Sequence, residues 1–500
     1  MSETLRTYED INKKIKNGDI VVVTADKMSD IVENDGIDIA ARDIDVVTTG
    51  TFGAMCSSGA FLNFGHADPP IKMEHVWLND VHAYHGNAAV DCYLGVTRRA
   101  DTDINYGGGH VIESLVAGEE IHLRATAYAT DCYPRTRIDT DFRINDINQA
   151  ILTNPRNAYQ RYVCATNGRD ETIYTYMGKL LPNYTNATYS GAGVLSPLSN
   201  DPDYETIGIG TRIFLGGGIG YITSQGTQHS PKTGFGTIFV SGDLKQMKQQ
   251  YLRGATFKNY GTTLYVGLGI PIPILNKGLA KKTAIKDEEI LTDVLDYGVG
   301  RRTRPILRKV NYKELKSGKI QLGERDVRVS SLSNQKLSKD ISELLQKWIE
   351  NDEFYLTKPA EKLPTEIDFK PMKMTEEIIY VRSIMRKAFT ITIDTPLESV
   401  ANKILNSNVN HHFVIDNGDL LKGIVTSFDI TRAVAKNKKT LEDIVVKKVI
   451  SIRPDEEART AARVMEKNNI SALAVIDKKK KLLGMISSED LSKLLGKYKH

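Results

Sequence analysis

A duplicated segment near the C-terminal end constrains the fold of this chain more than any other feature of its sequence. Val381-Arg-Ser-Ile-Met385 aligns with Leu441-Glu-Asp-Ile-Val445, and Gly423-Ile-Val-Thr-Ser-Phe-Asp429 aligns with Gly484-Met-Ile-Ser-Ser-Glu-Asp490. The two alignments have offsets of 60 and 61 residues. Offsets that agree this closely are hard to obtain by chance, so the sequence indicates two copies of one structural unit.

Each copy is predicted to fold in the order strand, helix, strand, strand, helix. The first strand is expected at 389–393 in one copy and at 449–452 in the other. A proline, Pro396 or Pro454, then opens the first helix, because proline is tolerated in the first helical turn. The lysine run at 478–481 lies between two strand-like segments and is interpreted as a solvated hairpin turn.

The last strand of each copy ends in a pattern of glycine, two apolar residues, serine or threonine, two further residues and aspartate, which resembles a tandem pair of CBS domains. A hydroxyl and exposed backbone N–H groups at a helix start can face an anion or a polar group. The aspartate can accept hydrogen bonds from both hydroxyls of a ribose. CBS pairs bind adenosine-containing ligands, so the resemblance implies one half-site at Thr426 and Asp429 and another at Ser487 and Asp490. The four residues also fit a second interpretation, in which they only cap helices.

Composition places the chain among ordinary globular proteins. Its 500 residues predict several domains, since a domain typically takes about 150 residues. Apolar residues make up 41% and charged residues 26% of the chain, which excludes the collagen-like and disordered classes. The formal net charge of +4 is too small to indicate nucleic-acid binding. No apolar run approaches the roughly 18 to 20 residues that span a bilayer, so we expect a cytoplasmic protein without a signal peptide or a membrane segment.

The domain organisation follows from the repeat and from the prolines ahead of it. Residues 1–365 alternate strand-like and helix-like segments, and this alternation predicts a large domain of the mixed α/β class. Prolines gather between 359 and 371 and predict a linker at 366–378. The two CBS-like copies then occupy 379–436 and 437–498.

Two glycine clusters lie in the N-terminal part, Tyr106-Gly-Gly-Gly-His110 ahead of a predicted helix and Leu215-Gly-Gly-Gly-Ile-Gly-Tyr221 ahead of Gln228 and His229. Neither has the strand-turn-helix context and the following acidic residue of a Rossmann fingerprint, and neither is a P-loop. A nicotinamide or nucleoside-triphosphate enzyme is therefore disfavoured. The clusters fit either tight turns or a cradle for a ligand.

Four cysteines occur in the chain and none forms a C-x-x-C pair, so no disulfide framework, metal site or self-held iron–sulfur cluster is expected. Between 121 and 132, apolar and polar residues alternate with the period of a β-strand, and this pattern puts Cys132 on the polar face at the end of the strand. Arg135 follows closely, and a nearby cation favours the reactive thiolate form. Cys132 is therefore the first candidate for a reactive thiol.

The other cysteines are ranked by their neighbours. Cys56 lies in Gly53-Ala-Met-Cys-Ser-Ser-Gly59, a turn that is expected to open a helix, and a helix N-terminus stabilises a thiolate. Cys56 is the second candidate for this reason. Cys92 falls on the same face of a predicted strand as its apolar neighbours, so it is predicted to lie in the core. Cys164 is interpreted as structural.

Three stretches carry a further resemblance, which extends over nearly the whole chain. They are Gly50-Thr-Phe-Gly53 with Cys56-Ser-Ser-Gly59, Ala129-Thr-Asp-Cys-Tyr-Pro-Arg135, and Gly216-Gly-Gly-Ile-Gly220 with Gln225-Gly-Thr-Gln-His229. They resemble an archaeal family of homocysteine biosynthesis proteins, whose members join such a region to a C-terminal CBS pair. The activity implied is that of an L-aspartate semialdehyde sulfurtransferase, in which sulfide sulfur replaces the aldehyde oxygen and reduction gives homocysteine. The resemblance implies Cys132 as the essential thiol, whereas Cys56 could hand on sulfur, support the site or only pack.

This implied chemistry assigns further roles by residue type. A persulfide on Cys132 would present a nucleophilic sulfur. The substrate has carboxylate, ammonium and aldehyde groups, and these need a planar cation, an acidic partner and a proton donor. Arg135, Asp131 and His229 fit these needs, and His110 is a second candidate for the general acid. Each of these four residues also fits a structural role in a salt bridge or a turn.

The expected partners follow from the motifs that the sequence lacks and from the family. No flavin, nicotinamide or cluster motif occurs, so no covalently bound cofactor is expected, and the resemblance implies electrons from a ferredoxin-type iron–sulfur partner protein. The CBS pair is expected to bind S-adenosylmethionine or 5′-methylthioadenosine and to form a homodimer. Two alternatives stay open: a non-catalytic S-adenosylmethionine sensor that acts on a partner, and a CBS-regulated enzyme of another chemistry, such as pyridoxal-phosphate sulfur transfer or a nucleotide dehydrogenase.

Overall fold

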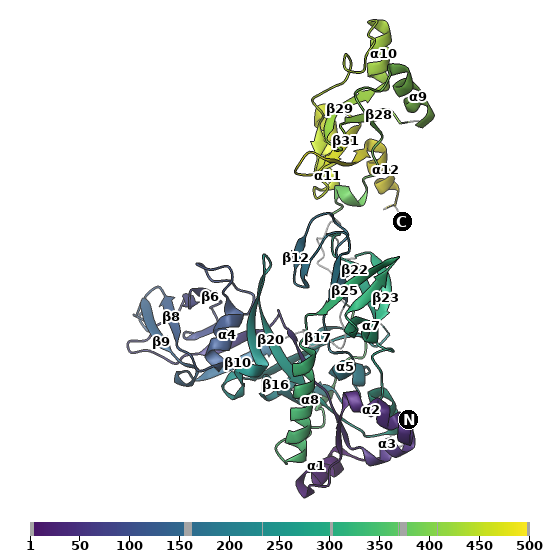
Figure 1. The fold of residues 1–500 in the computed structure, drawn as a ribbon. Coiled ribbons are helices and arrows are strands. Elements are labelled where there is room, and N and C mark those ends of the chain that lie inside the picture. Colours follow the sequence, from purple (N-terminus) through teal and green to yellow (C-terminus); the bar gives the residue numbers. More distant parts are fainter. Residues whose placement is uncertain are drawn as a thin grey trace. The chain divides into compact units, whose positions relative to one another are not determined.

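The structure is a computed structural model that describes residues 5–154, 163–232, 234–300, 304–368, 370, 378–407 and 409–497. The chain divides into two compact units, which are residues 1–298 with 304–370 and residues 299–303 with 371–500. Helices and sheets occur in both units (Figure 1), which confirms the predicted mixed α/β class. The linker expected at 366–378 lies mostly outside the described residues.

A large antiparallel sheet organises the N-terminal unit (Figure 1). Its strand order is β19-β20-β16-β17-β18-β10-β4-β7, and β3 also pairs with β20. The strands span Leu252–Phe257 (β19), Gly261–Gly269 (β20), Arg212–Leu215 (β16), Gly218–Ser230 (β17), Phe235–Asp243 (β18), Gln149–Asn154 (β10), Gly59–Asn63 (β4), Asp91–Gly95 (β7) and Thr51–Ala54 (β3). Gly216 and Gly217 have φ of 61° and 92° and join β16 to β17, so the second glycine cluster forms a tight turn.

The first glycine cluster lets helix α4 (Gly108–Val116) approach this sheet very closely. A Cβ atom added to Gly109 would overlap the carbonyl oxygen of Thr263 on β20. One added to Gly108 would overlap the carbonyl oxygen of Gly95 at the end of β7. Glycine is therefore needed where the first turn of α4 meets the two strands.

A smaller antiparallel sheet has the order β6-β5-β8-β9. Its strands span Val81–Ala83 (β6), His75–Leu78 (β5), Ile121–Thr126 (β8) and Arg137–Phe142 (β9). The odd-numbered residues of β8 are buried, and the even-numbered ones are exposed or partly exposed. The alternation predicted for this strand is confirmed, and it leaves one face of β8 toward the apolar core.

A third sheet follows the order β23-β22-β11-β14-β25-β24 and mixes parallel with antiparallel pairs. Its strands span Ile306–Asn311 (β23), Leu291–Asp296 (β22), Cys164–Thr166 (β11), Asn186–Tyr189 (β14), Arg325–Ser331 (β25) and Lys319–Leu322 (β24). The short hairpin of β12 (Ile173–Thr175) and β13 (Gly178–Leu180) lies in the chain between β11 and β14. This sheet has an apolar cluster of its own, which includes Val294 and Tyr312.

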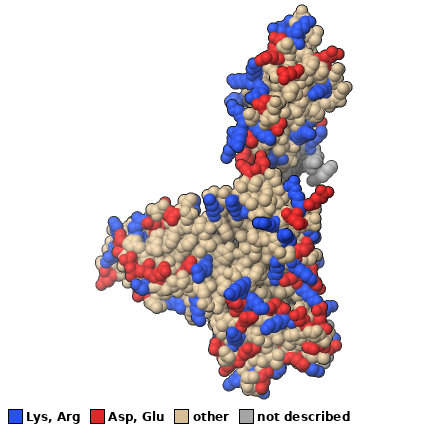
Figure 2. Space-filling model, viewed as in Figure 1, with Lys and Arg blue, Asp and Glu red and all other residues tan. Residues whose placement is uncertain are grey.

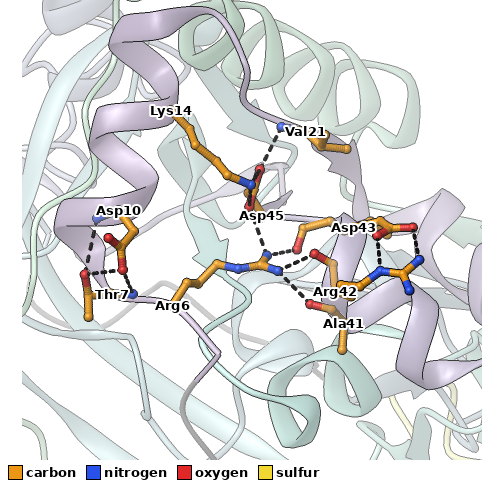
Figure 3. Close-up of polar contacts among 10 residues, drawn as sticks. Arg6, Thr7, Asp10, Lys14, Val21, Ala41, Arg42, Asp43 and Asp45 are labelled. Atoms are coloured by element: carbon orange, nitrogen blue, oxygen red, sulfur yellow. Dashed lines mark hydrogen bonds and ion pairs between the residues drawn. The ribbon is translucent and has the colours of Figure 1, made fainter.

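A buried carboxylate fixes the N-terminal segment (Figure 3). Asp45 lies between helix α3 (Ile37–Asp43) and strand β2 (Val46–Thr48) and is fully buried. Its carboxylate accepts hydrogen bonds from Lys14 Nζ at 2.8 Å and from the Val21 backbone at 3.0 Å, and it pairs with Arg6 at 3.0 Å. A buried charge requires such partners, so the network holds helix α1 (Tyr8–Asn17) against the core.

Helix α8 (Gln335–Glu350) packs against strand β3. Its buried residues Ile341, Leu345 and Ile349 belong to one apolar cluster with Phe52 of β3. The Phe52 backbone N–H also donates to Ser338 Oγ at 3.0 Å. The strand that leads into the Cys56 turn is thus held by packing and by a hydrogen bond.

The C-terminal unit contains the two predicted copies, and the predicted element order is confirmed. The first copy has β27 (Thr390–Ile391), α9 (Leu397–Ser407), β28 (His411–Ile415), β29 (Leu421–Thr426) and α10 (Ser427–Ala435), and the second has β30 (Ser451–Ile452), α11 (Ala458–Asn468), β31 (Ala472–Ile476), β32 (Leu482–Ser487) and α12 (Ser488–Lys497). Arg386 bridges to Met485 and Val446 bridges to Ile424. The segment ahead of the first strand of each copy therefore pairs with the last strand of the other copy, and the two copies form one unit.

The visible surface carries charges of both signs. Figure 2 shows lysine and arginine side chains interspersed with aspartate and glutamate over each unit, and a largely uncharged area in the middle of the N-terminal unit. Among the described residues, no helix combines the length and the apolar character that crossing a membrane requires.

Candidate functional site

Cys132 lies in the loop that joins β8 to β9. The two strands pair through Thr126 and Arg137. Within the loop, the Thr130 backbone N–H donates to Tyr133 O at 3.0 Å, and the Tyr133 N–H donates to Thr130 O at 3.1 Å. This turn presents an exposed Cys132 side chain, with Thr130 Oγ1 3.6 Å from its sulfur. The thiol is therefore open to a sulfur donor or a small aldehyde.

Two expectations about this loop need correction. β8 ends at Thr126, opposite the first residues of both its partner strands, His75 of β5 and Arg137 of β9. Cys132 thus lies beyond the strand and not on its polar face. The Arg135 guanidinium donates to the backbone oxygens of Pro69 at 2.9 Å and Asp68 at 2.7 Å. These contacts aim the guanidinium at the backbone of that segment, and Arg135 fastens the loop.

Cys56 lies in the turn between β3 and β4. No helix begins there, contrary to the expectation, because the residues that follow pair with β10 and β7 as strand β4. Thr263 on β20 donates its hydroxyl to the partly buried Cys56 sulfur at 3.1 Å. Burial and the nearby Cys56 charge raise the pKa of Tyr260, and raise that of Tyr265 to about 12. The Cys56 sulfur therefore has a hydroxyl donor and two neutral phenols around it, and a donor favours its thiolate form.

The two candidate thiols lie at opposite ends of β4. Cys56 precedes the first residue of this 5-residue strand. The Cys132 loop contacts the segment after the last one, where the Tyr133 ring stacks on His66 with 6.0 Å between centroids. A strand rises about 3.3 Å per residue, so β4 separates the two ends by roughly 15 Å. The structure does not bring Cys56 and Cys132 into contact within one chain.

The two candidate histidines are enclosed by other groups. His229 is 1% exposed, its ring lies 3.6 Å from that of Tyr204, and its Nε2 lies 2.8 Å from Pro202 O. His110 stacks on Tyr106 with 5.3 Å between ring centroids. Burial lowers the pKa of both imidazoles. Their contacts favour neutral histidines that position neighbouring segments.

The remaining cysteines are core residues, as predicted. Cys92 on β7 and Cys164 on β11 are both 0% exposed. Burial raises the pKa of each thiol to about 12, so both are un-ionised at neutral pH. Within the described part of the chain, no three His, Cys, Asp or Glu side chains are grouped to hold a metal ion.

A row of three tyrosines near Cys56 was not predicted from the sequence. Tyr260 precedes β20, Tyr176 lies in the β12–β13 turn, and Tyr297 follows β22. The rings of Tyr176 and Tyr260 are 6.1 Å apart, and the Tyr176 and Tyr297 hydroxyls are 2.9 Å apart. The Arg304 guanidinium lies 3.9 Å from the centre of the Tyr297 ring. These residues come from separate turns without a shared pattern, and only the fold brings this tyrosine row together.

The first CBS half-site borders a cavity. Thr426 and Asp429 line a cavity of about 340 Å³ together with residues of the second copy, including Lys448 and Asn469. The Thr426 hydroxyl donates to Asp429 at 2.7 Å, and Asp429 also pairs with Arg432 of its own helix at 3.0 Å. The pair thus caps helix α10 and faces a space at the same time.

The second CBS half-site is covered by an arginine of the other copy. The Ser487 hydroxyl donates to Asp490 at 2.6 Å, which repeats the arrangement of the first half-site. Arg386, in the first copy ahead of β27, lies with its Nε 3.2 Å from Asp490. At the equivalent position the other half-site has Val446, which carries no charge. The duplicated sequence therefore gives two unequal half-sites.

Comparison with known proteins gives consistent matches over most of the chain. The family described as "Homocysteine biosynthesis enzyme, sulfur-incorporation" matches residues 20–356, and the CBS domain family matches residues 381–436 and 441–497. An L-aspartate semialdehyde sulfurtransferase of Methanosarcina acetivorans is 51% identical over 98% of this chain and 99% of its own length. A protein of the same name from Methanocaldococcus jannaschii is 49% identical over 98% and 99%. A CBS domain pair solved in complex with 5′-methylthioadenosine and S-adenosyl-L-methionine is 36% identical, covering 24% of this chain and 99% of that one with a TM-score of 0.24.

Proposed function

The chain belongs to the family of sulfur-incorporating homocysteine biosynthesis enzymes, and from this premise we propose that it converts L-aspartate semialdehyde and sulfide into homocysteine. The observation that carries the proposal is the 51% identity to an L-aspartate semialdehyde sulfurtransferase over 98% of the chain. This identity extends through the N-terminal unit and the CBS pair together. An exposed thiol on a short loop, at Cys132, supplies the nucleophile that the chemistry needs.

Cys132 carries the sulfur as a persulfide in this proposal. The terminal sulfur of a persulfide ionises more readily than a thiol and attacks the aldehyde carbon. Loading Cys132 from sulfide releases two electrons to the oxidised form of the iron–sulfur partner protein. The reduced form of that partner returns two electrons when the sulfur–sulfur bond is cleaved after the attack. Loss of water then leaves a thiocarbonyl, which two further electrons and two protons reduce to the thiol. The exposure of Cys132 supports this role, because donor and acceptor must both reach the sulfur.

The electrons come from a ferredoxin-type iron–sulfur partner protein in this proposal. The net reaction consumes two electrons for each sulfur transferred, so a reductant has to be supplied. A thiol on an exposed loop can meet such a partner, whereas a buried thiol such as Cys92 cannot. Purified chain with sulfide and the semialdehyde alone is then expected to make little homocysteine.

The other site residues take supporting roles. Cys56, whose sulfur accepts a hydrogen bond from the Thr263 hydroxyl, lies in this proposal where the substrate is held. Arg135 holds the Cys132 loop through the backbone of residues 68–69. His229 positions the end of β17 through its stacking on Tyr204. Because β4 separates the two thiols, the Cys132 loop has to leave its contacts, or a second chain has to supply it, before its sulfur reaches the Cys56 side.

The CBS pair binds an adenosyl ligand, S-adenosylmethionine or 5′-methylthioadenosine, and thereby regulates the enzyme. The cavity beside Thr426 and Asp429 supports this part of the proposal, because a hydroxyl and a carboxylate at a helix start can hold a ribose. The pair also forms the contact of a homodimer. Asp429→Ala is expected to weaken binding of either ligand at least tenfold by calorimetry on the full chain. Unchanged binding in both Asp429→Ala and Asp490→Ala would contradict this assignment.

The proposed activity is tested by reconstitution. The full-length chain is mixed with sulfide, L-aspartate semialdehyde and a reduced iron–sulfur protein, and homocysteine is measured by mass spectrometry. We expect formation that depends on every component and stops in Cys132→Ser, whereas Cys92→Ala should retain it if the variant folds. Absence of homocysteine in the complete mixture, or full activity of Cys132→Ser, would contradict the proposal.

A further inference from the structure

Arg304 has an unusual environment for a partly buried arginine. Its guanidinium stacks on the Tyr297 ring at 3.9 Å, and its Nε is buried without a hydrogen-bond partner among the described residues. Among those described residues, no carboxylate pairs with the Arg304 guanidinium either. Arginine placed away from water normally pairs with a carboxylate or phosphate. The guanidinium of Arg304 therefore has in-plane N–H groups available for an anion.

The position of Arg304 relates it to the Cys56 turn. Arg304 lies just before β23, and Tyr297 lies just after β22, the strand that pairs with β23. From Tyr297, the tyrosine row continues through Tyr176 to Tyr260, which lies three residues before Thr263, the donor of the 3.1 Å hydrogen bond to the Cys56 sulfur. A cation and a thiol thus lie at the two ends of one row of phenols.

We propose that Arg304 binds the carboxylate of a small amino-acid substrate at the tyrosine row, on the Cys56 side of the molecule. Stacking on Tyr297 fixes the guanidinium plane and leaves its edge free, which suits two parallel hydrogen bonds to a carboxylate. Burial raises the pKa of Tyr260, so this phenol adds no negative charge that would repel an anion. Partial burial strengthens the attraction compared with a surface lysine.

This inference replaces a sequence-based expectation. Arg135 was predicted to supply the planar cation for the substrate, but its guanidinium is engaged by the oxygens of Asp68 and Pro69. Arg304 has the same chemistry without such partners. Its assignment to the semialdehyde carboxylate rests on the proposed function, whereas its ability to attract an anion toward Cys56 does not.

The anion attraction can be measured by alkylating Cys56 with two reagents of different charge. Iodoacetate is an anion and iodoacetamide is neutral, and with both the thiolate forms a carbon–sulfur bond and displaces iodide. The ratio of the two rates at Cys56 is read by peptide mass spectrometry on the full-length protein at low salt, and Cys132 in the same sample is the internal control. We expect Arg304→Gln to lower the ratio at Cys56 about fivefold, and 1 M salt to lower it in the parent chain as well.

Two further variants make the experiment decisive. Arg304→Lys keeps the charge and should retain the ratio within about twofold, whereas the exposed Arg325→Gln should leave it unchanged. An unaltered ratio in Arg304→Gln, or failure of Cys56 to react with either reagent, would overturn the proposal. A lowered ratio in a protein that makes no homocysteine would refute the proposed function and leave the carboxylate site standing. If the protein is active, Arg304→Gln should raise the KM for the semialdehyde at least tenfold with kcat changed less than threefold.

Discussion

Cys132 and Cys56 are both candidate thiols, and their surroundings differ in almost every respect. Cys132 is exposed on a loop whose arginine is directed at the backbone, and one hydroxyl lies 3.6 Å from its sulfur. Cys56 is partly buried, accepts a hydroxyl hydrogen bond at 3.1 Å and lies beside the tyrosine row. From this difference we propose a division of work, in which the accessible sulfur meets external donors and the enclosed one belongs to the place where a small substrate is held.

The largest expected effect separates the two thiols by activity. Cys132→Ser removes the sulfur carrier and is expected to lower homocysteine formation at least about 10³-fold. Cys56→Ala leaves the carrier intact and should cost about ten- to hundredfold, because it changes only the substrate side. Steady-state rates in the reconstituted assay measure both variants. Equal losses would remove the distinction between the two sites, and a larger loss in Cys56→Ala would reverse it.

The second expectation concerns the buried thiols, which set the baseline for the comparison. In folded protein at pH 8, Cys92 and Cys164 should react with iodoacetamide at least about 100-fold more slowly than Cys132, because their pKa of about 12 leaves almost no thiolate. Each additional pH unit up to 10 should raise their thiolate fraction about tenfold, as long as the fold persists. Peptide mapping of a time course provides the rates. Labelling of all four cysteines at similar rates would contradict the assigned environments.

Much of the architecture was predictable because it depends on local pattern. The repeat predicted two β-α-β-β-α copies, and the alternation along 121–126 predicted the buried face of β8. The core position of Cys92 also followed from nearby residues. The spacing of residues within a window of about ten positions determines these features, so the sequence alone predicts them.

The errors arose where distant strands decide the outcome. The expected helix after Cys56 is a strand because β10 and β7 pair with it. β8 stops at Thr126, opposite the first residues of both its partner strands, β5 and β9. The tyrosine row joins turns as much as 121 residues apart in the chain, at the contact between Tyr176 and Tyr297. No local pattern records such pairings, so the composition of the candidate site could not be read from the sequence.

A smaller effect tests the hydroxyl contact of Cys56. Thr263→Val removes the donor to the sulfur and should slow alkylation of Cys56 about three- to tenfold, because the thiolate loses a hydrogen bond. Thr130→Val is the matched control, since its hydroxyl lies near the sulfur of Cys132 at the longer distance of 3.6 Å. Each variant should affect only its own cysteine. An effect of Thr263→Val on both thiols would indicate a general loss of structure.

The smallest effect is expected for Arg135. Because its guanidinium donates to backbone oxygens of Asp68 and Pro69, Arg135→Lys should change the alkylation rate of Cys132 less than about twofold. The same time course by mass spectrometry measures it. A tenfold decrease would restore the original idea that this arginine activates the thiol directly.

The most direct measurement is the location of sulfur on the protein itself. Full-length protein is treated with a sulfur donor, digested without reductant and searched for a mass increase of about 32 Da on each cysteine peptide. The account predicts the added sulfur on Cys132, and none on Cys92 or Cys164. A protein that gains no sulfur at Cys132 under conditions where it makes homocysteine would contradict the central claim.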